Sequence, residues 1–380
     1  MTDLELPLAG VTVVSLEQAV AGPMATRHLA DLGARVIKLE RPGIGDFARG
    51  YDQVVNGLAS HFVWLNRSKE SFAVDLTTDE GRANALQLIG RADVFVQNCA
   101  PGVAQRLGLG SEALRKLWPG LVVVNISGYG EDGPKRDRKA YDMLIQAETG
   151  MVSVTGTPDT ATKTGIPSAD IAAGMYAALA AASALFRRTR NGAGATVEVS
   201  MFDAAVEWMG YALYVQLYAG RQIERRGLGH ASIAPYDAYP TKDGSILIGV
   251  QNDSGWRSLA DGVFGRPDIA DDPRFSTNMA RVAHRQECDE FVSSQTSQWS
   301  TEQLDQRLAE AGVPAAQIND MGAVVDHPQL SERKRWRTVD TENGAIRALL
   351  PPMTFADVDL RMDPVPALGE HNEQILSELE

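Results

Sequence analysis

The sequence predicts an α/β protein in which a large domain with a mainly parallel sheet is joined to a smaller α+β domain. Over the first 200 residues, short apolar runs rich in β-branched residues alternate with helical stretches. Strands separated by helices of this length form βαβ units and therefore parallel sheets. After Ala219 the pattern changes to a charged stretch, a hairpin and several helices. A chain of 380 residues leaves room for two hydrophobic cores.

Six strands are predicted in the first part of the chain. Each is a short run rich in valine, isoleucine or leucine and bounded by polar residues or glycine. The predicted strands are residues 11–16, 35–39, 72–76, 93–97, 121–126 and 196–199.

The helices between these strands are predicted from the signals at their ends. Residues 24–32 have a helical pattern that Gly33 ends as a C-cap. Thr77–Glu80 has the spacing of a capping box, which predicts that a helix starts there. A long helix is predicted over residues 202–217.

The strand, loop and helix at 11–32 form a unit that is Rossmann-like in outline. Its loop, Ala19-Val-Ala-Gly22-Pro-Met-Ala25, lacks the G-x-G-x-x-G pattern of nicotinamide-binding proteins. A helix N-terminus behind a glycine can still accept a phosphate through its free N–H groups. The alternative is that Gly22 serves only the tight turn.

The large domain is predicted at 1–220, completed by 326–380, and the small α+β domain at 225–325. Prolines between 351 and 366 predict an extended C-terminal segment that returns over the large domain.

The small domain is predicted to contain a hairpin and three helices. The hairpin covers residues 238–250, with its turn at Asp243-Gly244. The helices are predicted at about 255–264, 281–299 and 301–311.

Composition and charge exclude several classes of protein. The 36 basic and 49 acidic residues give a net charge of -13, so we expect no nucleic-acid partner. Cys99 and Cys288 stand far apart, without a Cys/His cluster, so no metal site is predicted. The N-terminus lacks the pattern of a signal peptide, and the apolar stretch 171–186 is shorter than the roughly 20 residues that a bilayer needs. We therefore expect a cytoplasmic protein without a membrane partner.

Basic residues follow several of the predicted strands. Arg41 comes after the second strand, Arg106 ends a loop after the fourth, and residues 135–139 hold four cations in five positions. A run of charges is often only a solvated surface. Because the carboxyl ends of parallel strands are where open α/β sheets bind ligands, the arrangement favours an anionic ligand at this edge.

Asp170 opens an alanine-rich stretch, Ile171 to Phe186, with helical character. From the residues alone, Asp170 is either the N-cap of this helix or an acid exposed at the floor of a cleft.

Several motifs, in this order along the chain, resemble one known family. They are Ala21-Gly-Pro23, Asp31-Leu-Gly-Ala-Arg-Val-Ile-Lys-Leu-Glu40, Asn66-Arg-Ser-Lys69, Asp75-Leu76, Asn98, Pro101-Gly102, Arg106-Leu-Gly108, Tyr141-Asp142, Gln146, Asp170 with Gly174, Ala234-Pro-Tyr236, His327-Pro-Gln-Leu330 and Leu368-Gly-Glu-His371. The set resembles class III CoA-transferases, the family of formyl-CoA:oxalate transferase, the carnitine CoA-transferases and α-methylacyl-CoA racemase. The resemblance covers nearly the whole chain.

The resemblance implies roles for individual residues. Asp170 falls on the family's catalytic aspartate. The residues that fall on the CoA site are Val20, Ala21, Arg41, Val74, Asn98, Arg106, Leu107, Lys139 and Tyr141. The resemblance also implies acyl-CoA and carboxylate substrates, no tightly bound cofactor, and a homodimer of interlocked subunits.

A carboxylate nucleophile suggests a mechanism. Aspartate has an ordinary pKa of about 3.9, so it is expected to be an anion at neutral pH. It would attack the donor acyl-CoA to give a mixed anhydride, and then an aspartyl-CoA thioester. The alternatives are a racemase, which needs proton-transfer groups on both faces of the α-carbon, and a non-catalytic acyl-CoA binder. Tyr141 stands where racemases have a histidine, and a tyrosine is a poor base at neutral pH, so transfer is favoured.

The loop 45–51, with His61, Trp64 and Arg67, is predicted to shape the acyl pocket. Arginines there, such as Arg49, suit the second carboxylate of a dicarboxylate, unless they contact CoA or lie on the surface. We therefore expect a small C4–C5 dicarboxylate, such as succinate with mesaconate, itaconate or citramalate.

Overall fold

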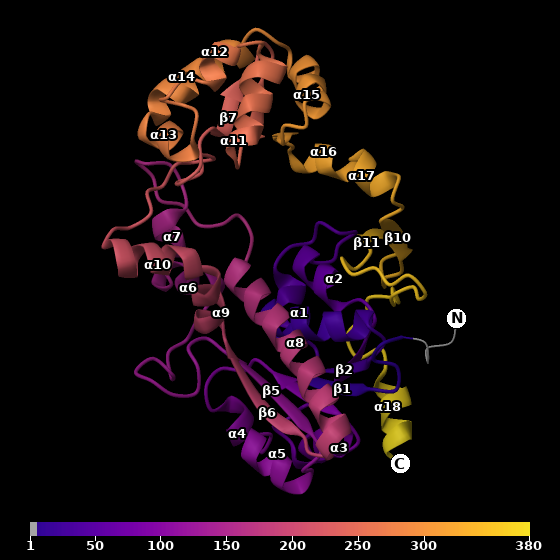
Figure 1. Cartoon of the computed structure of the whole chain (residues 1–380). Helices are drawn as coiled ribbons and strands as arrows, with labels where there is room; N and C mark the ends of the chain where they lie inside the picture. Colours follow the sequence, from indigo (N-terminus) through magenta and orange to yellow (C-terminus); the bar gives the residue numbers. More distant parts are fainter. Residues whose placement is uncertain (1–5) are drawn as a thin grey trace. The chain divides into compact units, whose positions relative to one another are not determined.

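The computed structural model describes residues 6–380 and separates into two compact units (Figure 1). The first unit consists of Met1–Val152, Lys163–Leu213 and Leu330–Glu380. The second consists of Ser153–Thr162 and Tyr214–Gln329. This division puts three segments that were predicted in the large domain, 153–162, 214–220 and 326–329, in the second unit.

The first unit is built on a six-stranded sheet in which every neighbouring pair is parallel, as predicted. The strand order is β3-β2-β1-β4-β5-β6, which is the order of doubly wound nucleotide-binding sheets. The order reverses between β1 and β4, and ligands bind outside the carboxyl ends of the strands at such a point. The strands are β1 (Thr12–Leu16), β2 (Arg35–Glu40), β3 (Lys69–Ala73), β4 (Val94–Gln97), β5 (Val122–Ser127) and β6 (Ala195–Ser200).

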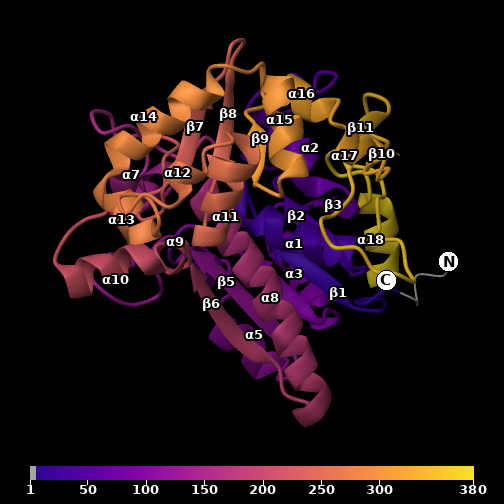
Figure 2. The ribbon, with the colours of Figure 1, turned by 45° about the horizontal axis from the view of Figure 1, so that its top comes forward.

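Helices cover both faces of this sheet. The helices of the first unit are α1 (Ala21–Asp31), α2 (Ser60–Asn66), α3 (Asp79–Gly90), α4 (Val103–Arg106), α5 (Ser111–Leu117), α6 (Asp142–Glu148), α8 (Ser168–Asn191), α9 (Met201–Trp208) and α18 (Asn372–Leu379). One face packs on α3, α5 and α18 in a single apolar core. Helices α1 and α8 lie side by side on the other face (Figures 1 and 2). Because both faces are covered, successive strand residues such as Val13 and Val14 are both buried.

The packing of α8 against α1 depends on Gly174. A Cβ atom at this position would lie 2.7 Å from the carbonyl oxygen of Ala21 and 2.7 Å from Cβ of Met24. Only glycine therefore permits the two helices to approach this closely.

Three predicted elements have different bounds in the structure. The strand predicted at 72–76 is β3, three residues earlier, because its polar residues Lys69 and Ser71 are buried. The N-cap of α3 is Thr78, whose hydroxyl accepts from the N–H of Gly81. The helix therefore starts one residue later than predicted, and the predicted capping box is wrong because Gly81 has no side chain to complete it. The helix predicted at 202–217 is broken at Met209 between α9 and α10 (Gly210–Ala219).

The C-terminal segment returns over the first unit, as predicted. The N–H of Ser68 donates to the carbonyl of Pro364, and the N–H of His371 donates to that of Ser71. An antiparallel hairpin that the sequence analysis missed, β10 (Trp336–Val339) and β11 (Ile346–Leu349), precedes this segment.

Helix α8 is longer than the apolar stretch that the sequence analysis considered. Within residues 6–380, it is the one helix that is long and apolar enough to cross a membrane by length and composition. The expectation that this segment is too short to cross a bilayer is therefore wrong, because α8 has 24 residues. The inner face of α8 packs on α1 and β5, which is typical of a core helix.

The second unit holds a three-stranded antiparallel sheet of order β7-β8-β9, with strands β7 (Tyr236–Pro240), β8 (Ser245–Gly249) and β9 (Ala315–Gln317). The hairpin of β7 and β8 confirms the predicted one. The α-helices that begin in the second unit are α11 (Asp253–Arg257), α12 (Pro267–Ala270), α13 (Asn278–Ala283), α14 (Arg285–Thr296), α15 (Thr301–Glu310), α16 (Met321–Val325) and α17 (Pro328–Ser331). The short helix α7 (Met151–Val154) begins in the first unit and ends in the second. The helix predicted at 281–299 is interrupted at His284, between α13 and α14.

Candidate active site

A tight turn at residues 17–22 leads from β1 into α1 at the carboxyl edge of the sheet. Asn98, the residue directly after β4, holds this turn through its side-chain amide. Its Oδ1 accepts from the N–H of Gln18 (2.8 Å), and its Nδ2 donates to the carbonyl of Gln18 (2.8 Å). Oδ1 of Asp46 accepts from the N–H of Ala19 (3.0 Å), which lies in the left-handed region at φ +63°. The turn is thus pinned on two sides.

Helix α1 begins at Ala21, three residues earlier than predicted. The side chain of its N-cap residue, Val20, makes no capping hydrogen bond. Pro23 has no N–H, but this costs nothing in the first turn, where backbone N–H groups have no helical acceptor. The N–H groups of Ala21 and Gly22 therefore have no acceptor within the helix.

Asp170 is the third residue of α8, and it is not the N-cap. The N-terminus of α8 is capped from α6, where Oδ1 of Asp142 accepts from the N–H of Ala169 (2.8 Å) and of Asp170 (3.3 Å). Pro167 stands at the N-cap position and makes no side-chain bond. The N-cap alternative for Asp170 is therefore wrong, and Asp142 performs that function.

The side chain of Asp170 is half-buried where the N-termini of α1 and α8 meet. Its carboxyl group accepts a hydrogen bond from the N–H of Ala21. Burial and the negative charge of Asp142 raise the pKa of Asp170 to about 7, against the lowering effect of that hydrogen bond. The carboxyl is therefore about half ionised at neutral pH, and the expectation of an ordinary pKa near 3.9 is wrong.

Aromatic side chains lie beside this carboxyl. Burial, followed by the charges of Asp46 and Asp170, raises the pKa of Tyr51 to about 12. The Tyr51 ring packs edge-on to His61, with centroids 5.5 Å apart, and His61 packs edge-on to Trp64 at 6.5 Å. These residues come from the loop and helix that were predicted to shape the acyl pocket.

The profile of the family described as CoA-transferase family III matches residues 8–372. The chain belongs to this family. It is 36% identical to the succinate–glutarate CoA-transferase of Agrobacterium fabrum, over 100% of this chain and 98% of that protein. It is 34% identical to the succinyl-CoA–D-citramalate CoA-transferase of Chloroflexus aurantiacus, over 98% and 94% of the two chains. The crystal structure of a CAIB/BAIF family protein from Brucella suis matches with a TM-score of 0.86 and 36% identity, covering 99% of this chain and 100% of that one.

In this class III CoA-transferase, the residues predicted for the CoA site fall into two groups. The first group is held by packing or hydrogen bonds: Val20 and Ala21 are buried in the turn, Asn98 pins it, and Val74 and Leu107 pack into the core of the sheet. The second group is exposed and follows successive strands: Arg41 after β2, Arg106 after β4, and Lys139 and Tyr141 after β5. All nine therefore come from segments at the carboxyl edge of one sheet or just beyond it.

The run of cations at 135–139 is largely neutralised within the CoA-transferase itself. Lys135 and Arg138 pair with Glu148, the latter at 3.8 Å, and Arg136 pairs with its neighbour Asp137 at 3.1 Å. Among the described residues, Lys139 is the member of this run whose side chain has no acidic partner.

The two arginines expected to bind a dicarboxylate are already paired. Arg49 donates to both carboxylate oxygens of Glu40 (2.9 and 2.8 Å). Arg67 donates to both oxygens of Asp31 (3.0 and 2.8 Å). Because each guanidinium is neutralised by a buried acid, neither is a free cation for a substrate, and this expectation is wrong.

Two functional features escaped the sequence analysis. One is the capping role of Asp142, which tertiary structure alone reveals. The other is a set of charges under the turn, which includes Glu17, Lys38 and Lys69, each with a fully buried side chain. A charged residue inside an apolar strand, such as Lys38 in Val36-Ile-Lys-Leu39, was the available signal.

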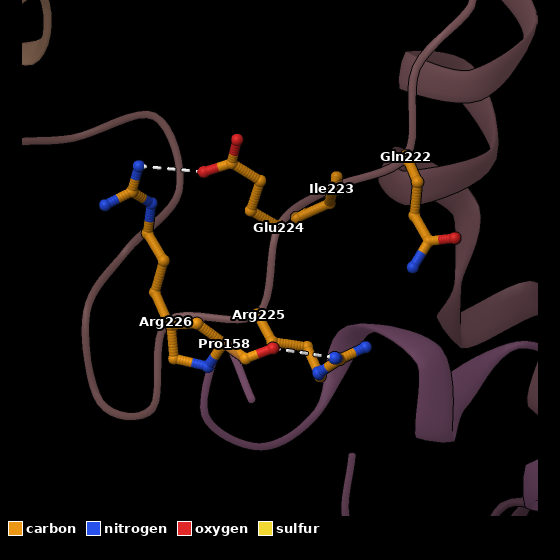
Figure 3. Close-up of a pocket in the computed structure, with 6 residues that line it drawn as sticks. All are labelled: Pro158, Gln222, Ile223, Glu224, Arg225 and Arg226. Atoms are coloured by element: carbon orange, nitrogen blue, oxygen red, sulfur yellow. Dashed lines mark hydrogen bonds and ion pairs between the residues drawn. The ribbon is translucent and has the colours of Figure 1, made fainter. Parts of the chain in front are cut away.

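A pocket of about 340 Å³ in the second unit lies among residues that play no part in this prediction. Figure 3 shows its lining residues, which are Pro158, Gln222, Ile223, Glu224, Arg225 and Arg226. Both arginines are occupied, because Arg225 donates to backbone carbonyls, including that of Pro158 (2.9 Å), and Arg226 pairs with Glu224 (3.0 Å). The pocket therefore offers no free cation for CoA phosphates.

The two cysteines are not activated nucleophiles. Burial raises the pKa of Cys99 to about 11 and that of Cys288 to about 12, and both thiols are free. A thiol with so high a pKa carries almost no thiolate at neutral pH.

Proposed function

We propose that this CoA-transferase moves CoA from an acyl-CoA donor to a small C4–C5 dicarboxylate through covalent intermediates on Asp170. One observation carries the proposal. Asp170 is half-buried at the meeting point of two helix N-termini, with the N–H of Ala21, in the first turn of α1, bonded to its carboxyl group. Helix N-termini favour negative charge, so the place suits a carboxylate nucleophile and the oxyanions that form at it.

The proposed sequence has four steps, without change of oxidation state. The Asp170 carboxylate attacks the thioester carbonyl of the donor, the C–S bond breaks, and a mixed anhydride and CoA thiolate form. The thiolate attacks the aspartyl carbonyl, which releases the donor acid and leaves an aspartyl-CoA thioester. The acceptor carboxylate attacks this thioester, the C–S bond breaks, and a second mixed anhydride and CoA thiolate form. The thiolate then attacks the acceptor's acyl carbon, which gives the product and regenerates Asp170.

Two relatives support the dicarboxylate part of the proposal. Their names describe transfer between succinate and glutarate, and from succinyl-CoA to D-citramalate. Both align over at least 98% of this chain. Since Arg49 and Arg67 are paired internally, we propose that other groups recognise the distal carboxylate, with Tyr51 and His61 of the predicted pocket segment as candidates.

The residue at 141 supports transfer over racemisation. Racemisation needs a proton acceptor on each face of the α-carbon at neutral pH. Tyr141 stands at the N-cap of α6, is largely exposed, and a phenol has a pKa near 10. It is therefore a poor second base.

The exposed cations at the sheet edge are proposed to bind CoA. Arg41, Arg106 and Lys139 make no side-chain hydrogen bond or ion pair with any residue from 6 to 380, so they are available for the phosphates. CoA is then a substrate, and we propose no tightly bound cofactor. We also propose that the enzyme is cytoplasmic and works as an interlocked homodimer.

The test combines a substrate panel with isotope transfer. Purified enzyme would be incubated with succinyl-CoA or acetyl-CoA and a panel of dicarboxylates and monocarboxylates, and acyl-CoA products identified by mass spectrometry. An acceptor labelled with ¹⁸O in its carboxylate leaves one label on Asp170, so the donor acid released in later turnovers should carry ¹⁸O. Hydroxylamine should inactivate enzyme preincubated with acyl-CoA.

The matched control is Asp170→Asn, which keeps the shape of the side chain and removes the nucleophile. It should lose transfer and show no inactivation by hydroxylamine. Turnover without ¹⁸O in the released acid, or near-normal turnover in the variant, would refute the covalent route. Use of monocarboxylates alone would refute the dicarboxylate assignment.

A further inference from the structure

Four charged side chains are sealed beneath the turn that leads into α1. Glu17 directly follows β1, and Lys38 lies on β2. Asp46 precedes the short 3-10 helix at Phe47–Gly50, and Lys69 is the first residue of β3. All four side chains are 0% exposed. The positive charges of the two lysines balance the negative charges of the two acids. Removal of any one side chain would therefore leave a buried charge without its partner, which is unfavourable.

The group is joined by short contacts centred on Glu17. Nζ of Lys69 lies 2.7 Å from Oε1 of Glu17, and Nζ of Lys38 lies 2.7 Å from Oδ2 of Asp46 and 3.5 Å from the same Glu17 oxygen. The second oxygen of Glu17 accepts from the hydroxyl of Thr26 on α1 (2.6 Å). Glu17 is thus fixed from the sheet and from the helix at once.

The same charges also hold the backbone of the turn at both ends. Nζ of Lys69 donates to the carbonyl of Pro23 (3.1 Å) and to Oδ1 of Asn66 (3.1 Å). Oδ1 of Asp46 accepts from the N–H of Ala19. Between these anchors lies Ala21, whose N–H is bonded to the carboxyl group of Asp170.

We propose that Lys69 is a positioning residue for CoA transfer: together with Glu17, it fixes the turn that presents the Ala21 N–H to Asp170. This inference rests on the proposed role of Asp170. Lys69 does not touch the reacting atoms. It acts through Pro23 and Glu17 on the one backbone donor that stabilises the ionised nucleophile.

The pKa of Asp170 distinguishes this positioning role from a purely structural one. Within the described part of the chain, burial, Asp142 and the Ala21 N–H set the pKa of Asp170, and Lys69 makes no direct contribution. Tyr51 is the other titratable group that interacts with Asp170, and the groups that interact with Lys69 are Glu17, Lys38, Asp46 and Asp31. A shift in the titration of Asp170 after a change at Lys69 must therefore pass through the turn.

The test is Lys69→Met, with Glu70→Gln as the matched control. Glu70 is the next residue on β3, and it pairs with Arg35 (2.7 Å) away from the turn. Carbon-13 NMR of aspartate-labelled protein gives the titration midpoint of Asp170, assigned by loss of its signal in Asp170→Asn. Loss of one hydrogen bond to a carboxylate should raise the midpoint by about one pH unit in Lys69→Met. Glu70→Gln should leave the midpoint unchanged, even if it lowers Tm.

A second variant keeps the proposal testable if Lys69→Met does not fold. Thr26→Val has the same shape and removes the hydroxyl that bonds to Glu17 (2.6 Å) and, more weakly, to the carbonyls of Gly22 (3.3 Å) and Pro23 (3.4 Å) in the same turn. Because Lys69 still holds Glu17 and Pro23 in this variant, the midpoint should move in the same direction by a smaller amount. An unchanged midpoint in every folded variant, or an equal shift in Glu70→Gln, would overturn the positioning role. Because the NMR titration needs no substrate, it gives an answer even if the wild-type enzyme transfers no CoA, which is the outcome that would refute the proposed function instead.

Discussion

At the residue scale, the ionisation of Asp170 should control the rate on the acid side. Only the carboxylate is a nucleophile, and the pKa of this group is about 7. We therefore predict that kcat/KM for acyl-CoA rises between pH 5 and 8 with a midpoint near 7. Asp142→Asn keeps an oxygen to cap α8 but removes the neighbouring negative charge, so it should move the midpoint to lower pH. A wild-type rate that is independent of pH over this range would contradict the assignment.

The same raised pKa predicts how stability changes with pH. The pKa of Asp170 is about 7 in the folded protein and 3.8 as the ordinary value, so the folded state favours the protonated acid. This contribution to stability is complete below about pH 3.8 and is lost as the pH rises through 7. An asparagine does not titrate, so Asp170→Asn should raise Tm relative to wild type more at pH 8 than at pH 5. Thermal unfolding followed by circular dichroism at both pH values tests this, and an equal difference would contradict it.

At the element scale, the crossing of α1 and α8 should tolerate no side chain at Gly174. Alanine normally stabilises a helix by about 1 kcal/mol relative to glycine, but overpacking here costs about 1–3 kcal/mol. Gly174→Ala should therefore lower Tm and transfer rate together, since Ala21 must move. Gly210→Ala on α10 is the control, because nothing lies within 4 Å of its added Cβ, and it should keep or raise Tm. Equal effects of the two variants would refute the argument.

The elements that sequence reasoning predicted well are those whose burial follows apolar character. Strands β1, β4 and β5 are mostly apolar, and they lie within one or two residues of their predicted places. Strand β2 was also predicted correctly, because Val36, Ile37 and Leu39 outweigh its charged residues. Strand β3 was displaced because Lys69 and Ser71 look like surface residues and are buried through ion pairs and hydrogen bonds instead. The start of α1 was missed for a related reason, since no capping side chain announces it.

At the scale of the whole molecule, the sequence predicts where the candidate site lies but not which of its charged side chains form ion pairs with one another. The resemblance proposes Asp170 and the segments for CoA, and the parallel sheet explains why cations after separate strands belong to one edge. Which cations are free could not be read from the chain. Arg49 and Arg67 find acids far from them in sequence or across a loop, and Glu148 neutralises two members of the 135–139 run. Such pairings depend on tertiary contacts that no local pattern encodes.

The exposed apolar side chains on the outer face of α8 predict that the protein forms a dimer. Met175, Leu179 and Phe186 lie on this face with 51%, 63% and 61% of their surface exposed, while the opposite face is buried on α1 and the sheet. A stripe of large apolar side chains on a core helix is unfavourable in water unless another surface covers it, and the proposed occupant is a second copy of the chain. Light scattering after gel filtration should give twice the chain mass of 41.0 kDa. Leu179→Glu should weaken this dimer, whereas Leu117→Glu, equally apolar and 61% exposed on α5, should leave it intact. A wild-type protein that remains at the monomer mass at micromolar concentrations would contradict the interlocked dimer.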